Sequence, residues 1–486
     1  MSVFVIYISN TPTQYKSKEV FMEKFFKIKE RGSTVKTEMI TGLTTFMAMA
    51  YILMVNAAMF ANLDGISYNA MYISTAISAV IGTLLMAFIA NLPLGLAPGM
   101  GLNAYFVYTI CLTFGLSYAN ALVLVLLDGI LFIILTVTGV RAMLFKAIPD
   151  CVRKAIPAGI GLFIAFLGLQ NAGIVVKDSS TAVNLASFNI LGGNATWAGI
   201  MPKLVTILAL IIIAVLAHKK VKGAVFGGII GGSILYYAFG FTVPGFYDGF
   251  IENLSFNPFN AFAEWGTNCF GKVFTEGFNF DAYLASHSTG DLVLVIITSA
   301  LALCLVDMFD TLGTLYGACS RGKLLDKNGE VPNFEKAMFS DAIATTLGSV
   351  CGTSTVTTFV ESSAGVAEGG KTGFSSLVTG ALFFIAMFLS PIAALIPGSA
   401  TAAALIYVGV LMIGGVVEID WTDSAVAVPS FMTMAMMPFT YNISYGIAFG
   451  LITYVLIKVF TGKVKEIKAF TWIISILFLI MFLVTH

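Results

Sequence analysis

Five carboxylic acids lie inside long apolar stretches of this sequence, at Asp128, Asp307, Asp310, Asp341 and Glu361. A charged group at the centre of a bilayer costs about 2.5–3.5 kcal/mol even on insertion scales, so such acids commonly mark a substrate or ion pathway. Asp307 and Asp310 are three residues apart, which places both near one face of a helix. A carboxylate accepts hydrogen bonds from N–H donors, and away from water it can load and release a proton near neutral pH. These acids therefore indicate ligand binding or proton transfer within a membrane.

Each acid also has a plain structural interpretation, in which a buried hydrogen bond or ion pair only fixes helix packing. We favour function for Asp310 and Glu361. Asp307 either serves the same site or merely supports its neighbour. We interpret Asp341 as a helix-start or packing residue. Asp128 lies deep in its apolar stretch, and both a proton site and a packing role stay open for it.

Histidine and cysteine do not suggest a second kind of site. His218, His287 and His486 fall in loops or at the chain end, and the six cysteines lack metal-ligand or disulfide-like spacing. The 26 basic and 26 acidic residues give no net charge, so nothing indicates a nucleic-acid partner. We therefore expect no catalytic residue, no metal and no cofactor.

Composition predicts that membrane helices carry these acids. Hydrophobic residues make up 58% of the 486 positions and charged residues 11%, against about a quarter charged in a soluble domain. One helical crossing needs about 20 apolar residues, and the sequence contains about fourteen such runs. They lie at 37–60, 69–91, 96–115, 118–140, 153–172, 200–217, 222–241, 291–318, 334–350, 354–371, 373–396, 399–417, 424–440 and 443–460. A further stretch, 470–485, either lies in the membrane interface or barely spans.

Basic residues cluster before the first run and after the fourth, sixth, eighth and fourteenth, all on one side of the membrane if fourteen helices are counted. The positive-inside rule makes that side, and the N-terminus, cytoplasmic. The segment between the seventh and eighth runs carries several acids and few basic residues, which suits the outside. We expect a multi-pass protein of the plasma or inner cell membrane.

Two short patterns occur once in each half of the chain. They are Ile148-Pro149 with Ala155 and Gly161 against Ile396-Pro397 with Ala403 and Gly409, and Gly223-Ala-Val-Phe226-Gly227 against Gly446-Ile-Ala-Phe449-Gly450. The first pattern pairs run five with run twelve, and the second pairs run seven with run fourteen. Each repeat therefore holds seven helices. Because seven is odd, the second copy enters the membrane from the opposite side. Such inverted repeats are typical of secondary transporters.

The third and tenth runs do not read as continuous helices. Pro93, Gly95, Pro98, Gly99 and Gly101 interrupt the third, and the tenth contains Thr353-Ser-Thr-Val-Thr-Thr358 before Glu361-Ser-Ser-Ala-Gly365. Proline removes a backbone donor, glycine weakens a helix, and β-branched residues favour extended chain. We predict a short extended stretch and a half-helix in each, with the positive helix ends facing the site. A pair of kinked helices is the alternative.

Four longer stretches resemble a known family, the AzgA-like adenine/guanine/hypoxanthine permeases of the nucleobase–cation symporters, which share the uracil–xanthine permease fold. The resemblance runs from about Lys24 to the C-terminus. Its motifs are Gly42-Leu-Thr-Thr-Phe46-Met-Ala-Met-Ala-Tyr51, Ala97-Pro-Gly-Met-Gly-Leu-Asn103-Ala, Asp307-Met-Phe-Asp310-Thr-Leu-Gly313-Thr-Leu and Gly352-Thr-Ser-Thr-Val-Thr-Thr358-Phe-Val-Glu361-Ser-Ser-Ala-Gly365-Val-Ala-Glu-Gly-Gly-Lys371-Thr-Gly373.

The resemblance implies an all-α polytopic fold, a seven-plus-seven inverted repeat with broken third and tenth helices. Runs one to four and eight to eleven would form a core domain, and the remaining runs a gate domain. The expected parts are a cytoplasmic segment at 1–36, core at 37–140, gate at 141–241, an extracellular loop at 242–290, core at 291–396, and gate with the C-terminal stretch at 397–486. A homodimer is expected by analogy alone.

The resemblance also implies the site. Related uracil permeases bind the base between the short strands of runs three and ten, using acids of runs eight and ten, which correspond here to Asp310 and Glu361. Thr314 stands where the uracil-permease pattern has a histidine, and Asn103 and Thr358 complete the expected substrate-binding set. Proton coupling would rest on Asp310, Glu361, Asp307 or Asp128.

The expected activity is proton-coupled import of adenine, guanine or hypoxanthine by movement of the core against the gate. Which purine is preferred, and whether sodium replaces the proton, stay open. An anion transporter of the sulfate-permease type is the alternative on the same architecture, and two acids at the site argue against it. An intramembrane aspartyl hydrolase would need its acids on two facing helices, whereas Asp307 and Asp310 share one.

Overall fold

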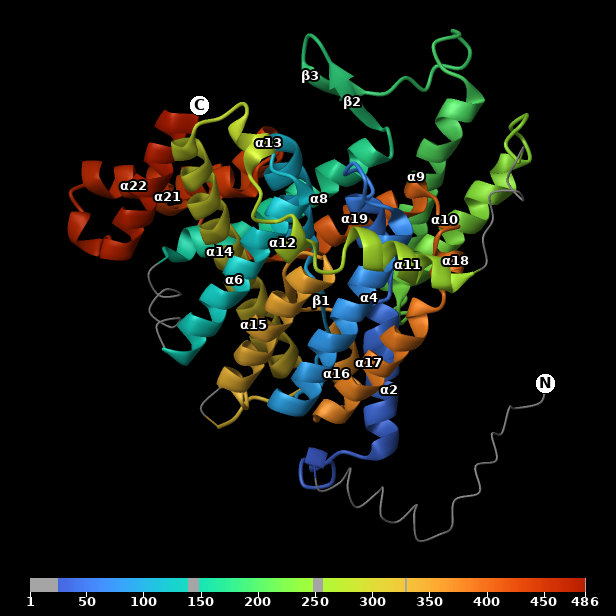
Figure 1. Ribbon diagram of the computed structural model, residues 1–486, viewed down its shortest axis with the longest axis horizontal. Coiled ribbons are helices and arrows are strands. Elements are labelled where there is room, and N and C mark those ends of the chain that lie inside the picture. Colours follow the sequence, from blue (N-terminus) through green and yellow to red (C-terminus); the bar gives the residue numbers. More distant parts are fainter. Residues whose placement is uncertain (1–24, 139–147, 248–256, 328–329, 486) are drawn as a thin grey trace.

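The computed structural model describes residues 25–138, 148–247, 257–327 and 330–485, and helices dominate it (Figure 1). Eight helical stretches of this described part are long and apolar enough to cross a membrane, judged by length and composition. They are α2 with α3 (Val35–Met49, Tyr51–Phe60), α4 with a π-helical turn (Tyr68–Leu85, Met86–Ala90), α6 (Tyr118–Val137), α8 (Asp150–Asn171), α9 (Trp197–His218), α14 (Thr289–Arg321), α19 with a 3-10 turn (Gly398–Met412, Ile413–Glu418) and α21 (Ile443–Phe460). The prediction of a mostly helical membrane fold is therefore confirmed.

Shorter helices fill most of the remaining apolar runs. They are α10 (Ala224–Gly240), α15 (Phe334–Cys351), α17 (Gly373–Met387), α18 (Ser390–Ala393), α20 (Ser424–Thr440) and α22 (Ala469–Thr485). Polar N-caps set where many of the helices begin: the side chains of Ser67, Ser117 and Ser288 each accept a backbone N–H of the first turn. Such caps satisfy amide groups that a helix start leaves without partners. The polar N-cap residues between the apolar runs thus set where these helices begin.

Two short strands lie within the third and tenth apolar runs. β1 (Leu96–Pro98) precedes α5 (Met100–Ala104), which continues as a π-helix over Tyr105–Thr113, and β4 (Val356–Thr358) precedes α16 (Ser362–Val366). The strands pair antiparallel, with Leu96 opposite Thr358 and Pro98 opposite Val356. All six strand residues are buried. Segments about 260 residues apart in sequence therefore meet as one small sheet.

Polar side chains of neighbouring helices satisfy the outer edges of this sheet. Thr83 of α4 exchanges hydrogen bonds with the N–H and C=O of Leu96, both at 3.0 Å. On the other edge, Thr345 of α15 donates to Val356 O at 3.0 Å, and Thr358 N–H donates to Asp341 Oδ1 at 3.1 Å. Buried backbone groups need such partners because water cannot reach them. The helices behind the sheet therefore hold irregular backbone in the protein interior.

Glycine contacts join the two halves of the chain. Gly161 of α8 and Gly409 of α19 face each other, and a Cβ on either would press against the backbone carbonyl of the other. These two glycines occupy the same place in the two predicted repeats. Likewise, α10 approaches α9 through Gly228, and α21 approaches α20 through Gly450. Corresponding helices of the two halves thus pack closely through glycine, as small residues permit in membrane bundles.

The segment predicted as an extracellular loop contains three helices, α11 (Pro258–Asn268), α12 (Lys272–Thr275) and α13 (Asp281–Leu284). Ser67 donates to Glu264 Oε2 at 2.5 Å, and Trp265 Nε1 donates to Cys351 O at 2.9 Å. Asn120 Nδ2 donates to Gly277 O at 2.7 Å. These bonds fasten the segment to the ends of α4, α15 and α6.

A β-hairpin after α8 was not predicted. β2 (Val175–Asp178) and β3 (Ala182–Leu185) pair antiparallel and project from the helical body (Figure 1). Asp178 closes the turn by accepting the N–H groups of Ser180 and Thr181, at 2.9 and 3.0 Å. The Ser180 hydroxyl also donates to this carboxylate, and these bonds hold the pKa of Asp178 well below its usual range.

Candidate functional site

A cavity of about 220 Å³ lies beside the β1–β4 pair, and we call it the strand cavity. Its lining comes from Tyr51 of α3, the β1–α5 turn, Asp310 and Thr314 of α14, and the segment 358–361. The facing wall is formed by Pro157 of α8 and by apolar residues of α19, namely Val408, Leu411 and Met412. A cavity of about 150 Å³ holds benzene in another protein. The strand cavity therefore has room for one small heteroaromatic ring system.

Glu361 enters this cavity from the first turn after β4. It occupies the N-cap position of α16, and the Tyr51 hydroxyl donates to Glu361 Oε1 at 2.6 Å. Asp310 reaches the cavity from α14, and its Oδ2 would lie 3.7 Å from a Cβ added to Gly99. Both carboxylates are partly exposed, whereas Tyr51 is fully buried. The structure thus brings the two favoured acids, 51 positions apart in the sequence, to one cavity.

Thr358 and Thr314, which the family resemblance implies as substrate-binding residues, also line the cavity. The backbone N–H of Thr358 is held by Asp341, as described above. Its hydroxyl is buried and has no hydrogen-bond partner within the described residues. A hydroxyl both donates and accepts. Thr358 therefore holds a buried polar group that the described part of the protein does not use.

The other three acids lie outside the cavity lining and are fully buried. Asp341 accepts the Thr311 hydroxyl at 2.9 Å in addition to the Thr358 N–H. It stands in the middle of α15, so the helix-start interpretation is wrong and it fixes the packing of β4 instead. Asp307 Oδ1 lies 3.5 Å from the same Thr311 hydroxyl.

Asp128 accepts the hydroxyl of Thr355, beside β4, at 3.2 Å. Asp128 and Asp307 as proton-coupling residues stay predictions. Asn103, predicted as a substrate ligand, is also fully buried outside the lining. Its amide donates to Pro98 O at 3.2 Å, and its oxygen accepts the Ser354 hydroxyl. These bonds tie the ends of β1 and β4 together, and the role of Asn103 as a ligand stays a prediction.

Sequence reasoning did not assign Tyr51, Phe359 or the apolar wall of α8 and α19 to the site. Tyr51 lies in the first of the four family-like motifs, where a polar ring in an apolar run was the available signal. Its contact with Glu361 spans 310 positions, which spacing along the chain cannot reveal. Within the described residues, no group of three or more His, Cys, Asp and Glu side chains could hold a metal ion.

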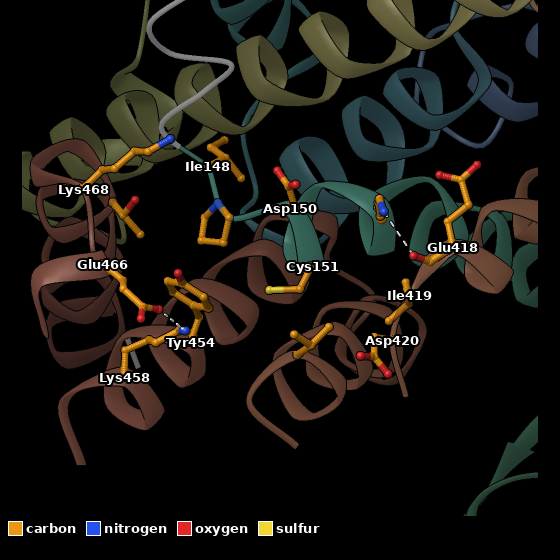
Figure 2. Close-up of a pocket in the computed structure, with 14 residues that line it drawn as sticks. Ile148, Asp150, Cys151, Glu418, Ile419, Asp420, Tyr454, Lys458, Glu466 and Lys468 are labelled. Carbon is orange, nitrogen blue, oxygen red and sulfur yellow. Dashed lines mark hydrogen bonds and ion pairs between the residues drawn. The ribbon is translucent and has the colours of Figure 1, made fainter. Parts of the chain in front are cut away.

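A second cavity of about 410 Å³ lies at the ends of α8, α20, α21 and α22, and we call it the helix-end cavity (Figure 2). Lys458 pairs with Glu466 at 2.5 Å, and Lys154 Nζ donates to Glu418 O at 3.1 Å. Asp150 pairs with Arg153 at 2.7 Å. Two acids of this lining, Asp150 and Glu466, therefore have basic partners. The strand cavity, whose described lining contains carboxylates and no Lys, Arg or His, is the better candidate for a transport site.

Apolar spanning helices around a buried cavity with carboxylates define a multi-pass membrane transport protein. The fold is similar to the transmembrane domain of a cyanobacterial bicarbonate transporter, BicA, with a TM-score of 0.56 at 15% identity over 86% of this chain and 97% of that one. That likeness shows the fold alone.

Sequence comparison gives the family. A family model described as "Permease family" (Xan_ur_permease) matches residues 36–449, and the chain belongs to this family. It is 39% identical to the guanine/hypoxanthine permease PbuO of Bacillus subtilis, over 94% of this chain and 99% of that protein. It is 35% identical to the adenine permease AdeP of Escherichia coli, over 99% of this chain and 100% of that protein. The predicted family is thereby confirmed.

Proposed function

We propose that this permease is a secondary active transporter that imports purine bases, namely adenine, guanine or hypoxanthine. The observation that carries the proposal is the meeting of Asp310 and Glu361 in one cavity of suitable size. Purine bases present ring N–H and amino donors, which carboxylates accept well. The names of the two relatives point to the same substrates.

The proposal includes the seven-plus-seven inverted repeat with broken third and tenth helices. The antiparallel pairing of β1 with β4 and the mutual contact of Gly161 and Gly409 support it. Runs one to four and eight to eleven form the core, and α8, α19 and the other remaining helices form the gate. The strand cavity lies where these two parts meet, so movement of the core against the gate carries the ligand across the membrane. The proposed assembly is a homodimer in the cell membrane with a cytoplasmic N-terminus.

We further propose that protons drive import. Asp310 and Glu361 line the cavity, so a proton and a base can load the same place from the same side. Two carboxylates in one low-dielectric site repel each other when both are ionised, which favours binding of a proton or of a donor-rich ligand. The same repulsion disfavours an anion, so the likeness to anion transporters does not favour anion transport here.

Uptake of labelled adenine, guanine and hypoxanthine tests the function, in a host without its own purine-base transport. We expect concentrative uptake of at least one base, collapse of uptake by a protonophore, and no effect of replacing sodium by choline. Failure to take up any purine would overturn the proposed function. Uptake that follows the sodium gradient would overturn proton coupling, and competition by bicarbonate or sulfate would favour the anion alternative.

A further inference from the structure

A group of polar contacts joins the proposed core to the proposed gate at a distance from the strand cavity. Thr109 lies in the π-helix Tyr105–Thr113 of the core, and its hydroxyl donates to Tyr441 O, at the end of α20 in the gate, at 3.1 Å. The amide of Asn171, the last residue of α8, donates to the Tyr108 hydroxyl at 3.4 Å. Thr109 and Tyr108 are buried. We call Tyr108, Thr109, Asn171 and Tyr441 the latch.

The latch and the strand cavity lie at different levels of the same helices. Pro157, which lines the cavity, is in the first half of α8, whereas Asn171 ends this helix, about 21 Å further along its axis. Gly99 lines the cavity at the start of α5, and Tyr108 and Thr109 lie in the π-helix that continues α5. Basic residues near the start of α8 place that end in the cytoplasm by the positive-inside rule. The latch therefore lies on the extracellular side of the cavity.

Aromatic rings fill the space around the latch. The Tyr441 ring is edge-on to Phe163 and Phe166 of α8, with ring centroids 6.0 and 5.5 Å apart. Phe163 is fully buried. Phe114 of the core and Tyr445 of α21 make a further contact, with centroids 6.1 Å apart. Ring pairs at such distances attract each other. In the described state, these rings and the latch close the boundary between core and gate on the extracellular side.

The backbone of Tyr441 adopts a conformation that is costly for a tyrosine. Its φ of 56° and ψ of 27° lie in the left-handed region, which glycine adopts readily and bulky residues rarely do. Such residues persist only where surrounding contacts hold them, and they cluster at clamps and switch regions. The bond from Thr109 and the contacts of the Tyr441 ring supply this support. Thr109 itself belongs to a π-helix, a form that occurs frequently at functional sites.

We propose that the latch is the extracellular barrier of this permease, which closes the path to the strand cavity and breaks before a base enters from outside. Opening releases the left-handed backbone of Tyr441. The inference rests on the proposed function and names residues that control access to its site. Core and gate touch at the latch only in the closed state, so each latch contact stabilises that state alone. Loss of a contact therefore shifts the population toward the state that is open to the outside.

Thr109→Val is the primary test, with Thr113→Val as the matched control. Valine keeps the branched shape of threonine and removes the donor to Tyr441 O. The Thr113 hydroxyl, on the same π-helix, donates at 2.8 Å to Tyr108 O of its own helix. The KM for a purine base that the wild type transports is measured from each side, in right-side-out and inside-out vesicles without a proton gradient. Apparent affinity from one side scales with the fraction of protein open to that side, so the ratio of extracellular to cytoplasmic KM follows the equilibrium between closed and open states.

We expect this KM ratio to fall about threefold or more in Thr109→Val, because one hydrogen bond changes an equilibrium constant by a factor of this size. Thr113→Val should keep the wild-type ratio. An unchanged or higher ratio in Thr109→Val, or an equal fall in Thr113→Val, would overturn the latch. A wild-type protein that transports no purine would instead overturn the proposed function.

Tyr441→Ala and Tyr441→Gly test the release of the strained backbone. Both variants lose the ring contacts, so both should have a lower KM ratio than a protein with an intact latch and strained backbone alone would give. Glycine adopts the left-handed conformation without the steric cost that alanine has, so Tyr441→Gly should favour the closed state more and have the higher ratio of the two. Equal ratios in the two variants would overturn the release of the Tyr441 backbone. If either variant does not reach the membrane, Thr109→Val decides on the latch.

Discussion

The strand cavity and the helix-end cavity differ in how their charges are satisfied. In the larger helix-end cavity, Lys458 pairs with Glu466, and Asp150 pairs with Arg153, which lies outside the lining. In the smaller strand cavity, Glu361 has the neutral Tyr51 hydroxyl as its side-chain donor and shares the space with Asp310. Paired charges near water contribute little to binding or stability. Charges of one sign against an apolar wall instead leave binding capacity for a ligand or a proton. Size and charge number alone would favour the helix-end cavity.

A glutamate-to-glutamine substitution in each cavity, at Glu361 and at Glu466, is expected to give the largest difference in purine uptake. Glu361→Gln keeps the shape of the side chain and removes the anionic acceptor, so we expect purine uptake to fall about 100-fold, since hydrogen bonds to charged groups are among the strongest. Uptake initial rates, normalised to the amount of protein in the membrane, check this. Uptake in Glu361→Gln within a factor of two of wild type would contradict the site.

Asp310→Asn is expected to have the next largest effect, a loss of about tenfold, because one carboxylate remains in the cavity. If Asp310 takes part in proton loading, the variant exchanges labelled for unlabelled base but does not accumulate it. Counterflow and net uptake, measured on the same vesicles, separate the two steps. Equal loss of both would assign Asp310 to base binding alone.

Asp341→Ala tests the support behind β4 and not the cavity itself. It leaves the Thr358 N–H without its acceptor, which costs about 1–3 kcal/mol for a buried group, and removes one of the hydrogen-bond partners of the Thr311 hydroxyl. We expect a lower melting temperature of the purified protein, with weaker base binding as a consequence. Asp341→Asn keeps one acceptor oxygen and should lie between wild type and the alanine variant. Unchanged thermal stability in Asp341→Ala would show that β4 is held by other contacts.

Glu466→Gln, the control in the helix-end cavity, is expected to have the smallest effect, with uptake within about twofold of wild type. The Lys458 ammonium donates to Glu466 and holds the pKa of this carboxyl below its usual range. A carboxyl whose pKa is lower in the folded than in the unfolded protein stabilises the fold at pH values above its unfolded pKa. This stabilisation is lost as the pH falls through its folded pKa. Any difference in thermal stability between wild type and Glu466→Gln should therefore be present at neutral pH and vanish in acid. A difference that grows in acid would contradict the ion pair.

Local chemistry made part of the fold predictable. The acids at 307, 310 and 361 were recognisable because charge inside an apolar run is costly, whatever the fold. The threonine run before Glu361 pointed to extended chain because β-branched residues favour it. The apolar runs at 118–140 and 291–318 predicted two helices, which begin in the structure at Tyr118 and Thr289. In each case a few neighbouring residues carry the information.

What escaped the sequence depends on contacts between distant segments. Asp341 was taken for a helix-start or packing residue, and the N–H that it binds belongs to β4, on another apolar run. Tyr51 could not be assigned to Glu361 because no spacing rule joins the first run to the tenth. The β2–β3 hairpin was missed although the turn after Asp178 is rich in serine and threonine, which favour turns. Each of its strands has only four residues, which is too short for a clear strand pattern in the sequence.

Equilibrium binding of labelled guanine and hypoxanthine to purified protein tests the central claim most directly, that Asp310 and Glu361 form the purine site. We predict saturable binding to wild type and to Glu466→Gln, and binding weakened about 100-fold in Glu361→Gln. Binding of equal strength in Glu361→Gln and wild type would contradict the assignment of the strand cavity.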